Sequence, residues 1–228
     1  MKILVVAATW MEVKLLTDEL EFISEKNSSF KEFRLGDKRI DVLISGIGAI
    51  FTTFHLTQVL LQNEYDLVIC AGIAGSLSSE LKIGDVVNVV SEEFADLGIE
   101  DKTDFLTLFE LGFLNKNDFP FLNGQLNAAK SDGWLKLKKV HGITVNKSHG
   151  NGESIKALNS KFSAQVESME GAAVLYVCTQ LNVPCHQIRA ISNYVEPRDS
   201  SNWDIPLALE NLKKSMLQTL QNCTVKVA

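Results

Sequence analysis

Two short apolar runs constrain most strongly what this chain can fold into. They occupy residues 2–8 and 65–71, neither shows the alternation of a half-exposed strand, and a further strand-like stretch follows at 186–191. A strand that helices cover on both faces needs apolar side chains on both, so such runs are typical of parallel sheets in α/β proteins. Helical patterns lie between and after these runs, including one at 49–61 and one at 204–221. The sequence therefore predicts an α/β fold with buried strands, and a hairpin at 30–35 and 39–44 adds an antiparallel pair.

The length of the chain bounds the number of domains. At 228 residues, with 46% hydrophobic and 22% charged residues, the chain can bury one sizeable core, and we expect a single domain over residues 1–228. No apolar run is long enough to cross a membrane. The first apolar run differs from a signal peptide because Glu12 and Lys14 follow it closely. We expect a cytoplasmic protein that does not bind membranes.

Charge and motif content exclude several classes of function. The net charge is −6 and the one lysine cluster, at 136–139, is short, so nucleic acid is not an expected partner. The glycine-rich stretches 45–48 and 72–76 match neither nucleotide fingerprint, which argues against NAD and ATP. No cofactor is expected. Four cysteines and four histidines are scattered without ligand spacing, so we predict buried reduced thiols and no metal site.

Glu170 lies where a strand is expected to end and a helix to begin. A carboxylate in the first turn of a helix is favoured by the exposed N–H groups, so Glu170 could serve only as a cap. Its neighbours favour a site, because Met169 is polarizable, Gly171 removes bulk and Ser192 with Asn193 follows the next strand. The carboxyl ends of strands in an open α/β sheet converge on one crevice. We therefore expect these groups to meet.

Glu12 occupies the equivalent position after the first strand. Taken alone, it could equally be a surface acid that the helix dipole favours. The glycine-rich stretches 45–48 and 72–76 are predicted to be turns after two strands, where the backbone can approach a ligand closely. The aromatic-rich stretch 96–125 has no clear periodicity. We expect it to cover a site or to contact another subunit, and the alternative is a small separate core under a long loop.

Six ordered motifs carry a family resemblance over nearly the full chain. They are residues 1–12, 45–48, 72–75, 81–85, 169–170 and 190–193. On these motifs the sequence resembles the nucleoside phosphorylase and nucleosidase family. Stretches 95–101 and 167–171, and Arg198-Asp199 with Trp203, make it most similar to the futalosine hydrolases, with the methylthioadenosine/S-adenosylhomocysteine nucleosidases as relatives.

The resemblance implies a fold and a set of roles. It implies a three-layer α/β sandwich with a central twisted mixed sheet flanked by helices, and a homodimer or higher homo-oligomer. It makes Glu12 the base that activates water, Met169 and Glu170 the ribose contacts, and Ser192 and Asn193 the purine contacts. Trp203 and Arg198 would meet the 5′ substituent, and Asp199 is a candidate proton donor. Other substrate contacts implied by the resemblance are Ala8, Ile50, Ile73, Ala74, Gly75, His149 and Ser168.

Two departures from the relatives refine these expectations. Phosphorylases of the family hold phosphate with arginines near the first and third strand ends, and the loops after Ala8 and Ala71 here contain none. Without a cationic clamp, water is the expected nucleophile. Asn193 replaces the aspartate of adenine-specific relatives, and an amide can donate to a 6-oxo oxygen, which favours hypoxanthine. The expected reaction is the hydrolysis of futalosine to hypoxanthine and dehypoxanthine futalosine, a step of menaquinone biosynthesis. The alternatives are a methylthioadenosine-type nucleosidase and a purine nucleoside binding protein without catalysis.

Overall fold

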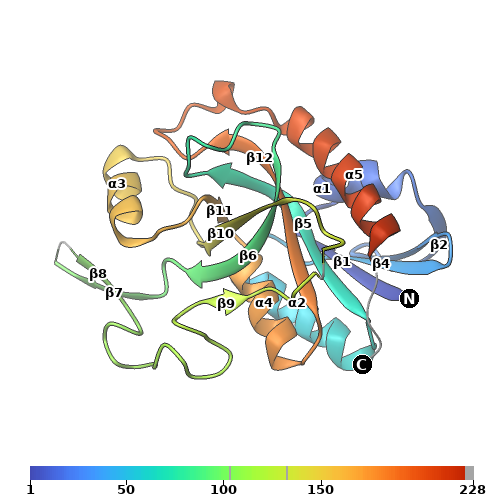
Figure 1. Cartoon of the computed structure of the whole chain (residues 1–228), viewed down its shortest axis with the longest axis horizontal. Coiled ribbons are helices and arrows are strands. Elements are labelled where there is room, and N and C mark those ends of the chain that lie inside the picture. The colour runs from blue at the N-terminus through green and yellow to red at the C-terminus, as the bar shows by residue number, and fades with distance from the viewer. Residues whose placement is uncertain (103, 132, 224–228) are drawn as a thin grey trace.

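A large mixed sheet forms the centre of the molecule (Figure 1). The computed structural model describes residues 1–102, 104–131 and 133–223. Within this part of the chain the strand order is β11-β10-β6-β12-β5-β1-β4-β3-β2, and the short β9 pairs with β6. The strands are β1 Lys2–Ala7, β2 Glu21–Asn27, β3 Phe30–Leu35, β4 Lys38–Ile44, β5 Leu67–Ser76, β6 Val86–Phe94, β9 Leu126–Asn127, β10 Lys138–Thr144, β11 Val166–Ser168 and β12 Cys185–Tyr194. The predicted hairpin, β3 with β4, is confirmed.

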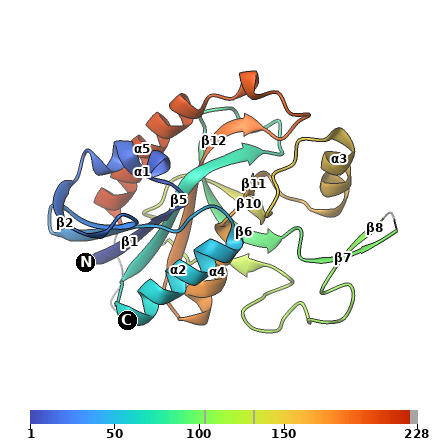
Figure 2. The ribbon, with the colours of Figure 1, turned by 180° about the vertical axis from the view of Figure 1, so that it is seen from behind.

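Helices cover both faces of the sheet, and the predicted three-layer sandwich is confirmed (Figures 1 and 2). Helices α1 (Trp10–Thr17) and α5 (Ile205–Asn222) pack on one face, and α2 (Ala49–Gln62) and α4 (Gly171–Gln180) pack on the other. Helix α3 (Gly152–Lys161) lies to one side, beyond β10 and β11. A short 3₁₀ helix, η1 (Ser200–Asn202), precedes α5. No helix in the described ranges is long and apolar enough to cross a membrane.

The strand β1 shows why the first apolar run is continuous. Ile3, Val5 and Ala7 belong to the core under α1 and α5. Leu4 and Val6 belong to the core under α2 and α4. Successive side chains on a strand point to opposite faces, so a strand between two helical layers is apolar at every position.

Strand β5 positions the functional groups, and its length differs from the prediction. Residues 72–76 were expected to form a turn, but β5 runs to Ser76 because β12 and β11 pair with it on either side. The register places Arg189 of β12 opposite Gly72 and Asn193 opposite Gly75, while Glu167 of β11 pairs with Gly75 from the other side. Pairing of β11 with both β10 and β5 closes β5, β12, β6, β10 and β11 into a ring.

The aromatic-rich stretch 96–125 contains a projecting hairpin and a small group of packed aromatic rings. Strands β7 (Gly98–Asp101) and β8 (Asp104–Thr107) form a hairpin that projects from the body (Figure 1). Phe109 and Phe121 pack edge to face at 5.2 Å between ring centroids, and Phe121 also packs on the core under α2 and α4. The two packed rings match the alternative of a small core under a long loop, although Phe121 connects them to the main core. Phe113 and Phe119 are exposed, so a role in covering a site or contacting a subunit stays a prediction for them.

Candidate active site

Glu12 is a buried carboxylate that accepts hydrogen bonds from two separate segments of the chain. One oxygen, Oε2, accepts a hydrogen bond from the Thr9 N–H at 3.0 Å, which caps α1. The other, Oε1, accepts from the Ile73 N–H on β5 at 3.1 Å. A residue that only caps its helix would not reach a strand sixty residues away. The side chain therefore fixes the end of β1 against the middle of β5, with only 8% of the residue exposed.

Glu170 lies at the start of α4, as predicted, but its side chain does not cap that helix. Its Oε1 accepts from the Gly48 N–H at 3.1 Å, and its Oε2 pairs with Arg189 Nη2 at 3.2 Å. The loop before α2, which carries Gly48, is thereby tied to the start of α4. Glu170 is directed inward, toward the same space as Glu12.

Arg189 is the central cation of this cluster, and the expectation that the site lacks one is wrong. Its guanidinium comes from the middle of β12 and not from a loop, and the side chain is 1% exposed. Besides Glu170, it donates to the Ile73 carbonyl from Nη1 at 3.3 Å and to Cys70 Sγ from Nη2 at 3.5 Å. The loops after Ala8 and Ala71 contain no arginine, and the cation of the site comes instead from inside β12.

Glycine 72 allows Glu12 and Arg189 to approach the same point of β5. A Cβ at this position would lie 2.5 Å from Arg189 Nη1 and 2.6 Å from Glu12 Oε1. Both distances are shorter than any ordinary contact of a Cβ. The glycine is therefore required for close approach of the carboxylate and the guanidinium to the strand backbone.

The electrostatics of the cluster suit acid–base chemistry. Burial raises the pKa of Glu12, the charge of Arg189 opposes that change, and the nearby Glu170 adds to it. A carboxylate whose pKa is raised toward neutrality is a better general base than an exposed one. A further carboxylate, Glu92 of β6, is fully buried near the start of α4, and burial raises its pKa to about 7.

Two polar atoms of this region lack a partner and mark space for a ligand. Ser168 Oγ and Arg189 Nε are buried, and neither has a hydrogen-bond partner among the described residues. Buried polar groups in folded proteins are normally satisfied, so an unsatisfied pair next to two carboxylates points to a bound polar molecule. Met169 lies between Ser168 and Glu170 and is half-buried. The predicted ribose contacts Met169 and Glu170 and the predicted substrate contact Ser168 thus belong to one region.

The base end of the site lies further along β5, at Gly75. A Cβ there would lie 3.3 Å from Asn193 Nδ2. Asn193 is oriented by its neighbours, because its Oδ1 accepts from Ser192 Oγ at 2.8 Å and its Nδ2 donates to the Tyr194 carbonyl at 2.9 Å. An amide nitrogen carries two N–H groups, so one remains for a ligand. Ile73 and Gly75 are two residues apart, about 7 Å along a strand, which separates the Glu12 end from the base end.

His149 is held beside this end by an acid that the sequence analysis did not single out. Glu167 accepts from the His149 N–H at 2.9 Å through Oε1 and contacts His149 Nδ1 at 2.5 Å through Oε2. Glu167 is buried on β11, three residues before Glu170. The acid belongs to the same short motif as Glu170, and that proximity in sequence was the available signal.

Of the remaining predicted residues, two alanines are buried and the others are more exposed. Ala8 is buried beside Ser45, Glu170 and Arg189, and Ala74 is buried on β5. Ile50 is 77% exposed on α2, away from these contacts. Arg198 stacks on Trp203, with its Cζ 5.4 Å from the ring centroid, in the loop before α5. Asp199 is exposed, and its carboxylate accepts from the Ser201 N–H and hydroxyl, which lower its pKa. An acid with a lowered pKa is a poor proton donor.

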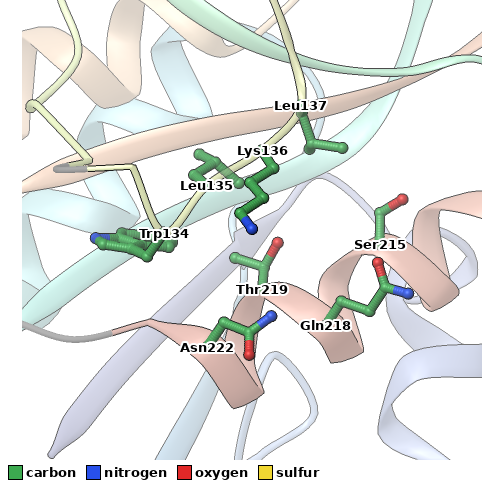
Figure 3. Close-up of a pocket in the computed structure, with 8 residues that line it drawn as sticks. All are labelled: Trp134, Leu135, Lys136, Leu137, Ser215, Gln218, Thr219 and Asn222. Atoms are coloured by element: carbon green, nitrogen blue, oxygen red, sulfur yellow. The ribbon is translucent and has the colours of Figure 1, made fainter.

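A cavity outside this cluster has a volume of about 260 Å³ and opens between residues 134–137 and α5 (Figure 3). Its lining includes Lys136, Gln218 and Asn222 but no carboxylate. The buried charges and unsatisfied polar atoms lie at Glu12, Glu170 and Arg189, so we place the candidate active site there and not in this cavity.

No group of three or more potential metal ligands occurs in the described residues. The four cysteines are buried and free, which confirms the prediction for the thiols.

Comparison with known proteins assigns the family. The model of the phosphorylase superfamily matches residues 2–224. The chain is 33% identical over 178 residues to a futalosine hydrolase from Acidothermus cellulolyticus, which covers 76% of this chain and 72% of that one. It is 31% identical over 175 residues to an aminodeoxyfutalosine nucleosidase from Helicobacter pylori, covering 74% and 73%. The structure of a futalosine hydrolase from Helicobacter pylori superimposes with a TM-score of 0.81 at 23% identity, covering 96% and 97%.

The chain therefore belongs to the phosphorylase superfamily. Within that superfamily it is a nucleosidase, an N-glycosyl hydrolase that acts on purine nucleosides. The predicted family and enzyme class are confirmed. The match to solved structures below 25% identity adds the fold alone.

Proposed function

We propose that this enzyme hydrolyses the N-glycosidic bond of futalosine and releases hypoxanthine and dehypoxanthine futalosine. Three curated relatives named as futalosine hydrolases, at 29–33% identity, support the choice of substrate. The observation that carries the proposal is the buried cluster of Glu12, Arg189 and Glu170 near Gly72 and Ile73 of β5, with an amide and no acid, Asn193, beside Gly75. The resemblance implies that this reaction is a step of menaquinone biosynthesis.

The water end of the site explains bond cleavage. A water molecule between Glu12 and Arg189 would be oriented by the guanidinium and would give its proton to the carboxylate as it attacks C1′. Cleavage of the C1′–N9 bond develops positive charge on the ribose ring. Glu170, which is positioned by Gly48 and Arg189, stabilises that charge and binds the ribose hydroxyls.

The charge balance of the cluster favours water over phosphate. Arg189 faces two carboxylates, Glu12 and Glu170, so the local charge is negative or neutral and does not attract an anion. A phosphate would have to displace one of these acids from the only guanidinium near them in the described structure. The local charge around Arg189, and not a lack of arginines, therefore favours water as the nucleophile.

The base end supports a 6-oxopurine. Asn193 has one amide N–H available after its bond to Tyr194, and this donor matches the acceptor O6 of hypoxanthine. Methylthioadenosine nucleosidase activity is the second candidate, because solved structures of that class share the fold, including one from Neisseria meningitidis at a TM-score of 0.78. An adenine presents a donor at this position, so it would find the amide oxygen already bonded to Ser192.

One experiment tests the proposal. The protein is incubated with futalosine, inosine and methylthioadenosine, with and without inorganic phosphate, and the released base and sugar are identified by chromatography. We expect hypoxanthine and free sugar from futalosine at a rate that phosphate does not change. Preferential release of adenine would establish the second candidate, and a sugar 1-phosphate would overturn hydrolysis. Ligand binding without any product would indicate the non-catalytic alternative.

We also propose that the enzyme forms a homodimer, as the resemblance implies. The helix α2 and the loop before it expose five large apolar residues close together in the sequence. They are Ile47, Ile50, Phe51, Phe54 and Leu61. Exposed apolar clusters of this kind mark contact surfaces. Light scattering after size-exclusion chromatography should give twice the mass of the chain, and a monomer at micromolar concentration would refute the proposal.

A further inference from the structure

We infer that His149 is the acid that protonates the departing purine, and that Glu167 is the positioning residue that orients its ring. This inference rests on the proposed hydrolysis of a purine nucleoside at the same site. The chemistry requires such a group, because the electron pair of the C1′–N9 bond moves into the purine as the bond breaks. A proton on a ring nitrogen turns the purine into a neutral leaving group.

The groups that surround the base end leave His149 as the acid. Asn193 is an amide and cannot supply a proton at neutral pH. Asp199 is exposed, its pKa is lowered by Ser201, and it caps the short helix η1. Glu12 and Glu170 lie two residues back along β5, where Glu12 binds the Ile73 N–H and Glu170 binds Arg189. Among the described residues near Gly75, the imidazole is the remaining group with a transferable proton.

The strand register places Glu167, the residue that holds His149, beside the base end of the site. Gly75 pairs with Asn193 on one side and with Glu167 on the other. Directly paired residues of an antiparallel ladder project to the same side of the sheet, so Glu167 projects to the side on which Asn193 Nδ2 meets Gly75. The loop of His149 is joined to the loop after β12, because the Gly150 carbonyl accepts from the Arg198 N–H at 3.0 Å.

The contact with Glu167 fixes which nitrogen can act. Glu167 binds His149 through both carboxylate oxygens, one to the backbone N–H and one to Nδ1. This arrangement assigns a proton to Nδ1 and leaves Nε2 without a protein partner among the described residues. A carboxylate on Nδ1 orients the ring, as in other acid–base pairs of histidine. Nε2 is then the atom that carries the transferred proton.

Other charged groups near this loop are peripheral to the ring. None of them forms a hydrogen bond to the imidazole, whereas Glu167 does. They are Lys147 in the same loop, Glu153 in the first turn of α3, Arg198 in the loop after β12, and Asp96, which binds Asn146.

The reaction then balances in protons. Water adds its oxygen to C1′ and gives one proton to Glu12, while Nε2 of His149 gives one proton to the purine. After release of the products, Glu12 loses its proton to solvent and His149 regains one. The net change is the addition of one water molecule across the C1′–N9 bond.

A comparison of two leaving groups tests this role. The variants are His149→Gln and Glu167→Gln, with His141→Gln as a matched control on the exposed face of β10. Each is assayed on the purine nucleoside that the wild type hydrolyses best and on 7-methylinosine, whose base already carries a positive charge and needs no proton to leave. General acid catalysis typically contributes a factor of about 10²–10⁴. We expect His149→Gln to lose at least about 100-fold in kcat on the ordinary nucleoside and less than about threefold on 7-methylinosine.

The pH profile separates the acid from its positioning residue. His149→Gln should abolish the fall in kcat on the alkaline side for the ordinary nucleoside, while Glu167→Gln should keep that fall and lower kcat on the ordinary nucleoside more than on 7-methylinosine. Thermal melts confirm that each variant is folded. An equal loss on both substrates, or an unchanged alkaline limb in His149→Gln, would overturn the assignment and leave the ring a packing role. If the wild type released adenine and not hypoxanthine, the proposed substrate would fail, but the ratio between the two leaving groups would still decide the role of His149.

Discussion

Arg189 and Glu170 form an ion pair of 3.2 Å in which the two side chains are only 1% and 7% exposed. Such a pair is costly to separate, because removal of one partner leaves the other as an uncompensated buried charge, at about 3–5 kcal/mol. Here Glu12 lies against the same guanidinium, so loss of Arg189 would leave two acids together. The ion pair therefore has a structural role in addition to its place in the site.

We predict that Arg189→Met destabilises the fold by about 3–5 kcal/mol at neutral pH and abolishes turnover. Burial already raises the pKa of Glu12 in the folded state, and without the charge of Arg189, which lowers it, this pKa rises further. A carboxyl group with a raised folded pKa costs stability as the pH rises above its unfolded pKa. The deficit should therefore shrink between pH 7 and pH 5. Urea denaturation of both proteins at the two pH values measures it, and a deficit that grows toward acid pH would contradict the ion-pair account.

Glu12→Gln should lose orders of magnitude in kcat with little change in ligand affinity. A general base acts in the transition state, so its loss reduces kcat more than binding. The glutamine oxygen can still accept from Thr9 or Ile73, and the melting temperature should stay close to that of the wild type. Single-turnover kinetics and a binding titration with a substrate analogue measure the two effects. Turnover near the wild-type rate would return Glu12 to a capping role.

The fold could be predicted largely because buried strands leave a clear signal. The run at residues 2–8 is apolar on both faces of β1, and the hairpin 30–35 with 39–44 matches β3 and β4. Strand β2 gave no such signal, since it is an exposed edge strand of mostly polar residues. The strand expected before Glu170 is short, because Phe162 is the C-cap of α3 and pairing with β10 begins only at Val166.

The two carboxylates of the cluster could be predicted from their positions after strands, and the cation could not. Glu12 and Glu170 stand where a strand gives way to a helix, a position that marks a crevice in α/β sheets. Arg189 lies inside β12, and only the three-dimensional structure shows which face it occupies. Glycines 72 and 75 suggested a turn, because sequence alone does not separate a glycine that bends a chain from one that admits a close contact.

Gly72→Ala tests the requirement for close approach. Its Cβ would fall within 2.6 Å of Glu12 Oε1 and of Arg189 Nη1, so one or both groups must move. A displacement of about 1 Å in a catalytic group can cost about 100-fold in rate. We predict a loss of that size in kcat/KM. Gly152→Ala is the matched control, because the nearest atom to its Cβ is Pro197 Cγ at 3.8 Å, and it should retain full activity. Full activity in Gly72→Ala would refute the argument.

Glu92→Gln should change how stability depends on pH. Glu92 accepts from Gln187 Nε2 at 2.7 Å and from Thr144 Oγ1 at 3.0 Å, and burial raises its pKa from 4.5 to about 7. Between these values the folded state binds more protons than the unfolded state, so the wild type loses stability as the pH rises. Gln at this position does not ionise and escapes that loss. At about 1.4 kcal/mol per pKa unit, the difference in unfolding free energy should move by about 3 kcal/mol in favour of the variant between pH 4.5 and pH 8. Urea midpoints across this range measure it, and a constant difference would show that Glu92 does not titrate in the folded protein.

Asn193→Asp should separate the two candidate substrates most sharply. The amide oxygen is held by Ser192 and one N–H by the Tyr194 carbonyl, so the second N–H is the group that meets O6 of a 6-oxopurine. An ionised aspartate would place lone pairs against that oxygen and lose a buried polar contact worth about 1–3 kcal/mol. We therefore predict that kcat/KM for futalosine falls by about tenfold to a hundredfold, while activity on the 6-amino analogue rises relative to it. Ser192→Ala serves as the control, because it frees the amide without adding charge and should reduce activity on both substrates alike. If the ratio of the two efficiencies does not change in Asn193→Asp, the residue does not read position 6 of the purine.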